Sequence, residues 1–524
     1  MMSPTQVNDT SAVMSGRHRL WMLVLVPCVM MHAPPVWPDQ LTREEISQRQ
    51  LIQILQQHWQ LACDELNRPN QKVSLQEAVD IGLKNNPVLS TTYSNWQATE
   101  WQARAIRREW YPSLTANNPD PDVVAYGHLN ETVKTASASS VNSLTSNQNI
   151  FYVAPRLQLN WTFLDPSRTP RLKASIATIR SRQLLFDVSA RNLVLDIQTA
   201  YYQLQQLREL RLSYASIYEL TRDQIRTAIA KRRSGVGSQG DVDQLNSQLL
   251  EQLIQLIHLY QQESTAANQL AYLMSLTPGN LVYPADQLSP GVGWKLPLQA
   301  TIDQALQLRE EIKANLADAE SFDWSSVSQL NRYLPSLSVF GQSQHNSVAT
   351  STAASDASPG SSTLNKFDLR NEIGLSFKWL LVDGGIDVAR ARSLQQQSLA
   401  SQADADLERF RVALQVENSY ATYRASSMVM DTARLQVKQA RKTVDFAIKA
   451  YKGTSADATT FIQNIQNYLN AVNSYSQSVS RYNIAVASLY RYSALWPQPA
   501  VNPLSDRLSV LKTNKAQFKD TSKN

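Results

Sequence analysis

The chain has 524 residues, of which 43% are hydrophobic and 15 are glycine, and its formal charge at pH 7 is +6. This composition is more polar than that of a compact enzyme of the same length, and it favours long helices that each bury a single stripe. Lysines and arginines alternate with acidic residues instead of clustering, which argues against nucleic acid as a partner.

The N-terminal residues have the pattern of a secretory signal peptide. Residues 17–19 are Arg-His-Arg and precede an apolar run over 20–31, which is too short to span a bilayer as a helix. We therefore expect a signal peptide over residues 1–38. Cleavage of this peptide would remove Cys28 and leave Cys63 as the single cysteine, so the mature chain could form no intrachain disulfide.

A Gln-rich segment over residues 39–72 has helical spacing and is expected to form an appended helix. Two similar units follow, one over 73–297 and one over 298–496. The opening LQEAVDIGLKNNP at 75–87 aligns with LQATIDQALQLRE at 298–310 at an offset of 223 residues. A second patch, YPSL against LPSL, has the same offset, so we interpret the chain as an internal duplication.

Each unit is expected to contain a β-hairpin. Residues alternate between apolar and polar after Pro112 and Pro335, and again before Trp161 and Trp379, as in strands with one face in lipid or core. Between these strands lie stretches rich in Ser, Thr, Asn and Ala, at 132–149 and 346–365, which we expect to be exposed loops. No other apolar run has the length of a membrane helix, so a membrane crossing would have to use strands.

Long helical hairpins are expected to complete each unit. Helical spacing without breaks extends over 170–233 and 386–451, followed by short turns and return helices with 3-4 heptad spacing, as at Ile465, Leu469 and Val472. Helices of this length are typical of coiled coils or helical tubes. The turns at the hairpin tips contain Gly235, Gly237 and Gly453. The last 28 residues, 497–524, are polar and are expected to be disordered.

The strand-to-helix junctions are the most distinctive motifs. WTFLDPS begins at Trp161 and WLLVDGG begins at Trp379. The tryptophans suit a membrane interface, whereas Asp165 and Asp383 are expected to cap the long helices. Gly384 and Gly385 permit a tight turn but lie in no phosphate-binding pattern.

Together these motifs, in this order and duplicated, resemble the TolC family of outer-membrane efflux proteins. The resemblance implies a homotrimer in which each chain gives four strands to a shared 12-stranded β-barrel, which continues into an α-helical coiled-coil tunnel across the periplasm. It also implies an exit duct in the outer membrane lipid, served by a periplasmic adaptor (membrane fusion) protein and an inner-membrane pump of the RND or ABC type. Small molecules and proteins, the latter by type I secretion, remain alternative cargoes.

In this family the helical tips form a constriction held by charged side chains. The candidates in this chain are Asp241 and Asp457, with Arg232, Arg233 and Lys452 as partners. Three copies of an aspartate around an axis would repel one another or bind cations. The family's closely spaced pair of aspartates on the second return helix is missing, since Ile462 and Ile465 occupy the corresponding places. The alternative role for Asp241 is helix capping.

The sequence contains no pattern typical of an enzyme. The six histidines are scattered without the spacing of a metal site, and we expect no cofactor. Glu310 and Glu311 are interpreted as a solvated helix face, not as an acid–base pair. The alternative to the duct is a soluble periplasmic coiled-coil scaffold or adaptor, which assembles other proteins and conducts nothing.

Overall fold

The computed structural model describes residues 54, 57, 70–117, 124–137, 140–153, 155–277, 279–354, 361–453 and 457–496. The chain divides into two units, Met1–Leu66 and Asn67–Asn524. In the first, Ile54 and Gln57 are helical and exposed, and the predicted signal peptide and most of the appended helix lie outside the described residues, as does the C-terminal tail.

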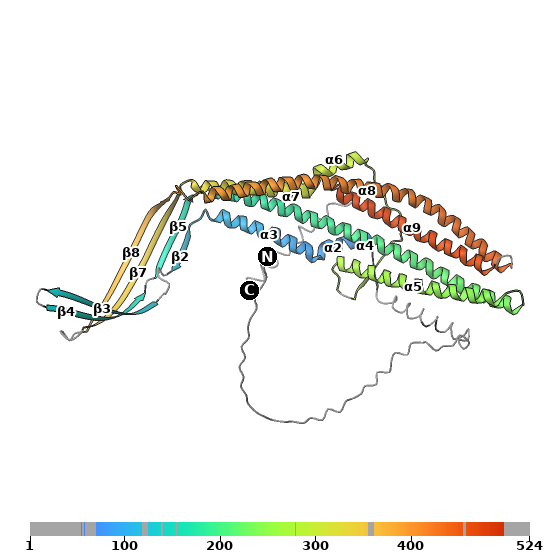
Figure 1. The fold of residues 1–524 in the computed structure, drawn as a ribbon, viewed down its shortest axis with the longest axis horizontal. Coiled ribbons are helices and arrows are strands. Elements are labelled where there is room, and N and C mark those ends of the chain that lie inside the picture. Colours follow the sequence, from blue (N-terminus) through green and yellow to red (C-terminus); the bar gives the residue numbers. More distant parts are fainter. Residues whose placement is uncertain are drawn as a thin grey trace, which may run out of the picture. The chain divides into compact units, whose positions relative to one another are not determined.

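The second unit consists of helices and strands in an order that repeats (Figure 1). The elements are β1 (Asn70–Val73), α2 (Leu75–Asn85), α3 (Pro87–Arg108), β2 (Ser113–Asn117), β3 (Val124–Ser137), β4 (Ser140–Val153), β5 (Arg156–Leu164), α4 (Arg168–Arg233), α5 (Gln239–Leu273), β6 (Leu281–Pro284), α6 (Leu298–Leu308), α7 (Glu310–Leu330), η1 (Asn331–Tyr333), β7 (Ser336–Ala354), β8 (Ser361–Lys378), α8 (Ile386–Lys452) and α9 (Ala458–Tyr492).

The two longest helices, α4 and α8, contain 66 and 67 residues, which corresponds to about 100 Å each. Neither contains an internal glycine, and the proline at position 170 lies in the first turn of α4, where it removes no helical hydrogen bond. The return helices α5 and α9 contain 35 residues each. Within the described ranges, no helix has an apolar stretch sufficient to cross a bilayer.

Side-by-side packing places the helices in a definite order. Along the hairpins, α5 packs on α4, α4 on α9 and α9 on α8; nearer the strands the order is α3, α4, α7 and α8 (Figure 1). Helix α8 therefore lies at one edge of the unit, and α3 and α5 lie at the other. The heptad spacing of the return helices explains this lengthwise packing.

The strands form one antiparallel sheet. Strand β7 pairs with β8 on one side and, on the other side, with β5 and then β4, while β2 pairs with β5 and β3 with β4. The chain thus makes four long strand paths, because β2 continues into β3 and β4 continues into β5. The outer edges are β2 with β3, and β8. These four paths match the four strands expected of one chain.

The predicted loops at 132–149 and 346–365 are wrong in most of their length. The first belongs to β3 and β4, and the second to the end of β7 and the start of β8. Composition misled the prediction because hydroxyl and amide residues lower the apolar content without preventing backbone pairing. Along these strands the ladder hydrogen bonds, not apolar burial, satisfy the polar backbone.

A small parallel sheet was not predicted. Strand β1 pairs with β6, and the pair packs on α4, where the Tyr201 hydroxyl donates to the Val73 carbonyl at 3.1 Å. These strands are four residues each and lack a clear period, which is why the pattern missed them. Strand β1 also crosses the predicted boundary at residues 72 and 73. It joins the N-terminal end of the unit to the connection between the two halves.

Candidate functional site

The two faces of the large sheet differ in chemistry. The register aligns Leu114, Leu159, Gly341 and Ile373 in one row across four strands. The neighbouring row on the opposite face is polar. Its residues are Thr115, Gln158, Gln342 and Glu372.

The apolar face is open to its surroundings. On β8, Ile373, Leu375 and Phe377 are 82%, 74% and 61% exposed. Trp161 on β5 and Trp379 just after β8 extend the same face and are 40% and 54% exposed. A soluble protein rarely leaves an apolar surface of this size uncovered, so the face requires an apolar environment.

The junction tryptophans occupy equivalent positions. The indole of Trp161 donates to the Trp110 carbonyl at 2.9 Å, and the indole of Trp379 donates to the Tyr333 carbonyl at 2.9 Å. In both places the bond links the end of a strand, β5 or β8, to the turn that leads into the strand paired with it, β2 or β7. The two tryptophans therefore fix the strand ends besides presenting aromatic surface.

The junction aspartates accept backbone hydrogen bonds at the start of the long helices. Asp383 accepts from the amides of Gly385 and Asp387 at 2.9 and 2.8 Å, and Gly384 and Gly385 adopt left-handed φ of 71° and 84°. A hydrogen bond from the Tyr333 hydroxyl, followed by the Asp387 amide, holds the pKa of Asp383 below its usual value. These geometries agree with the capping role.

Asp165 makes the equivalent turn with different neighbours. It accepts from the amide and hydroxyl of Ser167 at 3.0 and 2.7 Å. Arg168, which is 3% exposed, donates to the Thr162 carbonyl at 3.0 Å and lies 5.0 Å from the Trp110 ring. This arginine was not predicted, since nothing in the motif marks it as buried.

At the first hairpin tip, Ser238 caps α5 and Asp241 does not. The Ser238 hydroxyl accepts from the Asp241 amide at 3.0 Å, which leaves the Asp241 carboxylate free of the capping role. Gly235 has φ of 76°, and a Cβ on Gly237 would lie 2.9 Å from the Cβ of Lys231. Both glycines are thus required by the turn.

At the second tip, Asp457 is the capping residue. Its carboxylate accepts from the Thr460 amide at 2.9 Å, and hydrogen bonds from the Thr460 side chain and then from this amide lower the pKa of Asp457. Gly453 has an ordinary φ of −82°, so its conformation alone does not require glycine. Lys452 is exposed beside it, and residues 454–456 lie outside the described residues.

Contacts between the two tips centre on Tyr451, which is 1% exposed. The Lys231 ammonium donates to the Tyr451 carbonyl and lies 4.3 Å from its ring centroid, and the Phe461 ring stacks on Tyr451 at 5.8 Å. Burial, together with the nearby Asp241 carboxylate, raises the pKa of Tyr451 to about 12. The Asp241 carboxylate of one hairpin thus acts electrostatically on a tyrosine of the other.

The predicted cationic partners lie elsewhere. Arg232 donates to the Gln239 side chain, and Arg233 and Lys452 are exposed. In the described part of the tips, neither Asp241 nor Asp457 forms an ion pair with any of these three. Lys231 was missed because it is one of three cations at the end of α4, where the helix dipole favours any cation.

A buried charged cluster lies at the other end of the return helices. Arg309, 2% exposed, pairs with Glu311 at 2.9 Å and with Glu408 at 3.8 Å, and Arg491 also pairs with Glu311. Glu310 pairs with Arg191 at 2.8 Å, with both side chains about one-tenth exposed. The interpretation of Glu310 and Glu311 as a solvated face is therefore wrong, because α7 packs against α4 and α8 along its length.

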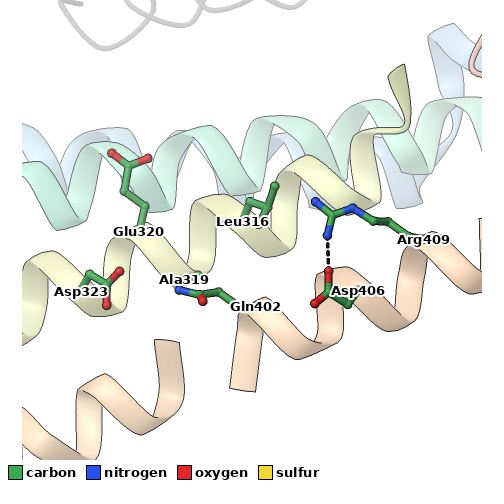
Figure 2. Close-up of a pocket in the computed structure, with 7 residues that line it drawn as sticks. All are labelled: Leu316, Ala319, Glu320, Asp323, Gln402, Asp406 and Arg409. Carbon is green, nitrogen blue, oxygen red and sulfur yellow. Dashed lines mark hydrogen bonds and ion pairs between the residues drawn. The ribbon is translucent and has the colours of Figure 1, made fainter. Parts of the chain in front are cut away.

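A hollow of about 350 Å³ lies between α7 and α8 (Figure 2). Glu320 and Asp323 of α7 and Asp406 and Arg409 of α8 are among the residues that line it, and Arg409 pairs with Asp406. Its lining is mostly charged and open, unlike the apolar enclosed pockets that bind cofactors. Among the described residues, no group of three or more potential ligands is arranged to hold a metal.

Comparison with known proteins gives the fold. No protein-family model and no curated protein sequence matches this chain. Several solved structures do match. The CmeC outer membrane channel of Campylobacter jejuni covers 84% of this chain and 88% of its own, with a TM-score of 0.63 and 15% identity. The outer-membrane channel OprN covers 81% and 91%, with a TM-score of 0.60 and 18% identity.

The open-state MtrE outer membrane channel of Neisseria gonorrhoeae covers 80% of this chain and 89% of its own, with a TM-score of 0.59 and 15% identity. This chain has the fold of the TolC-family channels. The resemblance expected from the duplicated junction motifs is confirmed at the level of fold. Within the TolC fold, the apolar face of the sheet and the facing hairpin tips are the two surfaces that bear on function.

Proposed function

We propose that this protein is an outer-membrane channel, the exit duct through which cargo delivered by an inner-membrane pump leaves the cell. The observation that carries the proposal is the large sheet, which exposes an apolar face and keeps a polar opposite face at the end of long helices. Lipid suits the first face and water the second. The polar backbone of such a sheet in lipid must be satisfied by closure.

Closure requires other copies of the chain. The sheet has two free edges, β8 and β2 with β3, and the helices have matching edges, α8 and α3 with α5. Joining one edge to the opposite edge of the next copy forms a head-to-tail interface, which closes into a ring. Four strand paths from each of three chains make the 12-stranded barrel of a homotrimer.

Exposed apolar residues lie along both helical edges. On α8 they recur on one side of the helix, opposite to the side that packs in its own chain, and on α5 they follow a spacing of four and three. The α8 residues are Leu399, Leu407, Phe410, Leu414, Met428, Leu435 and Phe446, and the α5 residues are Leu250, Ile254 and Ile257. Burial of these two stripes against each other would stabilise the ring.

The remaining parts follow from this assignment. The helical hairpins form a tunnel in the periplasm, where a periplasmic adaptor and a pump of the RND or ABC type meet the tips. The matching lengths of α4 and α8 and of α5 and α9 support the origin of the chain from two repeats. The duct is passive and uses no cofactor, and its cargo is set by the pump.

The test is conductance by the purified mature protein. We expect extraction from membranes only with detergent, a trimeric mass by light scattering, and discrete single-channel currents in planar bilayers. A mature protein found in the soluble fraction, without currents, would instead support the periplasmic scaffold and would end the duct proposal.

The tips provide a second readout of the same proposal. Asp241 lies on the first hairpin, and its charge raises the pKa of Tyr451 on the second, so we place Asp241 in the constriction. We expect Asp241→Ala to raise single-channel conductance, whereas Asp243→Ala, an exposed neighbour on the same helix, should leave it unchanged. Equal conductance of Asp241→Ala and wild type would remove Asp241 from the constriction.

A further inference from the structure

The last third of α8 carries an unusual row of exposed cations. Arg434, Lys438, Arg441, Lys442, Lys449 and Lys452 are all exposed. In the described part of the chain, none of the six forms an ion pair. Only Asp431 and Asp445 interrupt the row with negative charge over residues 431–452.

The six cations lie on one side of the helix. At roughly 100° per residue they fall within an arc of about 100°, and they extend over about 27 Å from Arg434 to Lys452. The helix dipole favours cations only in the last turn, which accounts for Lys449 and Lys452. It does not account for Arg434, Lys438 and Lys442, whose like charges four residues apart disfavour the helix.

In the equivalent part of α4, two arginines form ion pairs with acidic residues of the same helix. Arg222 pairs with Glu219 at 2.5 Å and Arg226 pairs with Asp223 at 3.1 Å, so the acids three residues earlier neutralise them. Nearer the strands, α8 does the same, as Arg409 pairs with Asp406 beside the hollow in Figure 2. The unpaired row is thus confined to the tip-proximal part of α8.

This basic side is distinct from the apolar stripe that faces the next copy. Met428, Leu435 and Phe446 define the stripe, and the centre of the basic row is rotated from it by about 90° around the helix. Ring closure through the stripe would therefore leave most of the basic row uncovered. The row is then available to a partner of opposite charge.

We propose that the basic side of α8 docks an acidic helix of a partner protein. The spacing of four residues between Arg434, Lys438 and Lys442 matches one side of a helix, and a helix of about 18 residues spans the row. Because this partner would meet the tips, the inference rests on the proposed function and adds the chemistry of the partner. Electrostatic complementarity of this kind sets specificity and association rate.

The experiment uses the full-length protein in detergent and two synthetic helical peptides. One peptide of 28 residues carries glutamates four and three residues apart along one side, and the other carries glutamine at the same positions. Binding is measured by fluorescence anisotropy between 50 and 300 mM NaCl. The variant Arg434→Gln/Lys438→Gln/Lys442→Gln is compared with Arg222→Gln/Arg226→Gln on α4 as the matched control.

We expect the glutamate peptide to bind wild type and the α4 control, with affinity that falls as salt rises. The triple variant should bind about tenfold more weakly, as expected for the loss of three exposed ion pairs. Equal binding of the two peptides, or unchanged binding by the triple variant, would overturn the proposal. So would tighter binding to a 20-nucleotide DNA strand or to phosphatidylglycerol vesicles than to the peptide.

Two further readouts separate this inference from the duct. A triple variant that loses its trimeric mass would place the basic side in the interface between copies, and would overturn the partner proposal. A protein that binds the glutamate peptide but gives no currents would retain the docking surface while refuting the duct. Currents without binding of the glutamate peptide would support the duct and refute the docking surface.

Discussion

Asp187 is a side chain whose ionisation the fold changes in the pH range of ordinary measurements. It lies on α4 close to Glu310 and Arg191, and burial followed by repulsion from Glu310 raises its pKa to about 6, despite the opposing attraction of Arg191. An unfolded aspartate titrates near 3.9. The folded state therefore binds a proton more tightly than the unfolded state, and stability falls as pH rises from about 4 through 6.

Replacing Asp187 should reveal this cost. We expect Asp187→Asn to stabilise the protein by about 1–3 kcal/mol at pH 7.5, because the variant has no buried charge to accommodate. The gain should shrink as pH falls through 6 and vanish near 4. The measurement is the thermal unfolding midpoint in detergent from pH 4 to 8, with Asp323→Asn, an exposed residue, as control. A gain that persists at pH 4 would assign the effect to packing.

At the scale of elements, the breaks between α2 and α3 and between α6 and α7 hold the ends of the return helices. Asn86, between α2 and α3, donates to the Leu273 carbonyl at 3.1 Å, and Arg309, between α6 and α7, donates to the Tyr492 carbonyl at 3.5 Å. Leu273 and Tyr492 are the last residues of α5 and α9. The same anchoring contact thus occurs in both halves, with different side chains.

Loss of Arg309 should be costly because its acidic partners are also buried. We expect Arg309→Met to destabilise by about 3 kcal/mol, since Glu311 and Glu408 lose their most buried cation, although Arg491 and Arg411 still pair with them. Arg180→Met, which breaks an exposed pair with Glu320, should cost at most about 1 kcal/mol. The double variant Arg309→Met/Glu408→Gln should recover part of the loss. Equal thermal midpoints for Arg309→Met and Arg180→Met would contradict the buried-charge account.

Much of the element order could be predicted from the sequence because its signals are local. The long helix ends at Arg233 as expected, and strands β5 and β8 end at Leu164 and Lys378, near the tryptophans of the two junction motifs. Helical spacing, proline and glycine determine the secondary structure of residues close to them in the sequence. These signals suffice for a fold built of long, regular pieces.

What the sequence could not predict depends on contacts between distant segments. Lys231 meets Tyr451 across 220 residues, and Arg309 is buried only because α8 and α9 pack over it. Capping of α5 by Ser238, and not by Asp241 as the alternative had it, was also missed, since both residue types favour helix starts. Pairing of β1 with β6 depends on the same long-range packing.

At the scale of the whole molecule, a duct can form only if the α8 edge of one copy packs on the opposite edge of the next copy. Phe410, on the exposed stripe of α8, is 76% exposed in one chain. We expect Phe410→Asp to convert the trimer into monomers by light scattering, because burial of an unpaired carboxylate between copies is costly. Val429→Asp, on another side of the same helix and 53% exposed, should remain trimeric. A trimeric Phe410→Asp would exclude this stripe from the interface.

The contacts of Asn86 and Arg309 with the ends of the return helices have a mechanical consequence. Each 35-residue helix extends about 52 Å from this contact to the tip and packs on α4 or α8 along the way. A rotation of about 5° at this contact moves the tip by about 5 Å, a distance comparable to the diameter of a hydrated ion. In the proposed ring, a small rotation at these two contacts in each copy would therefore be amplified into a larger displacement of the tips.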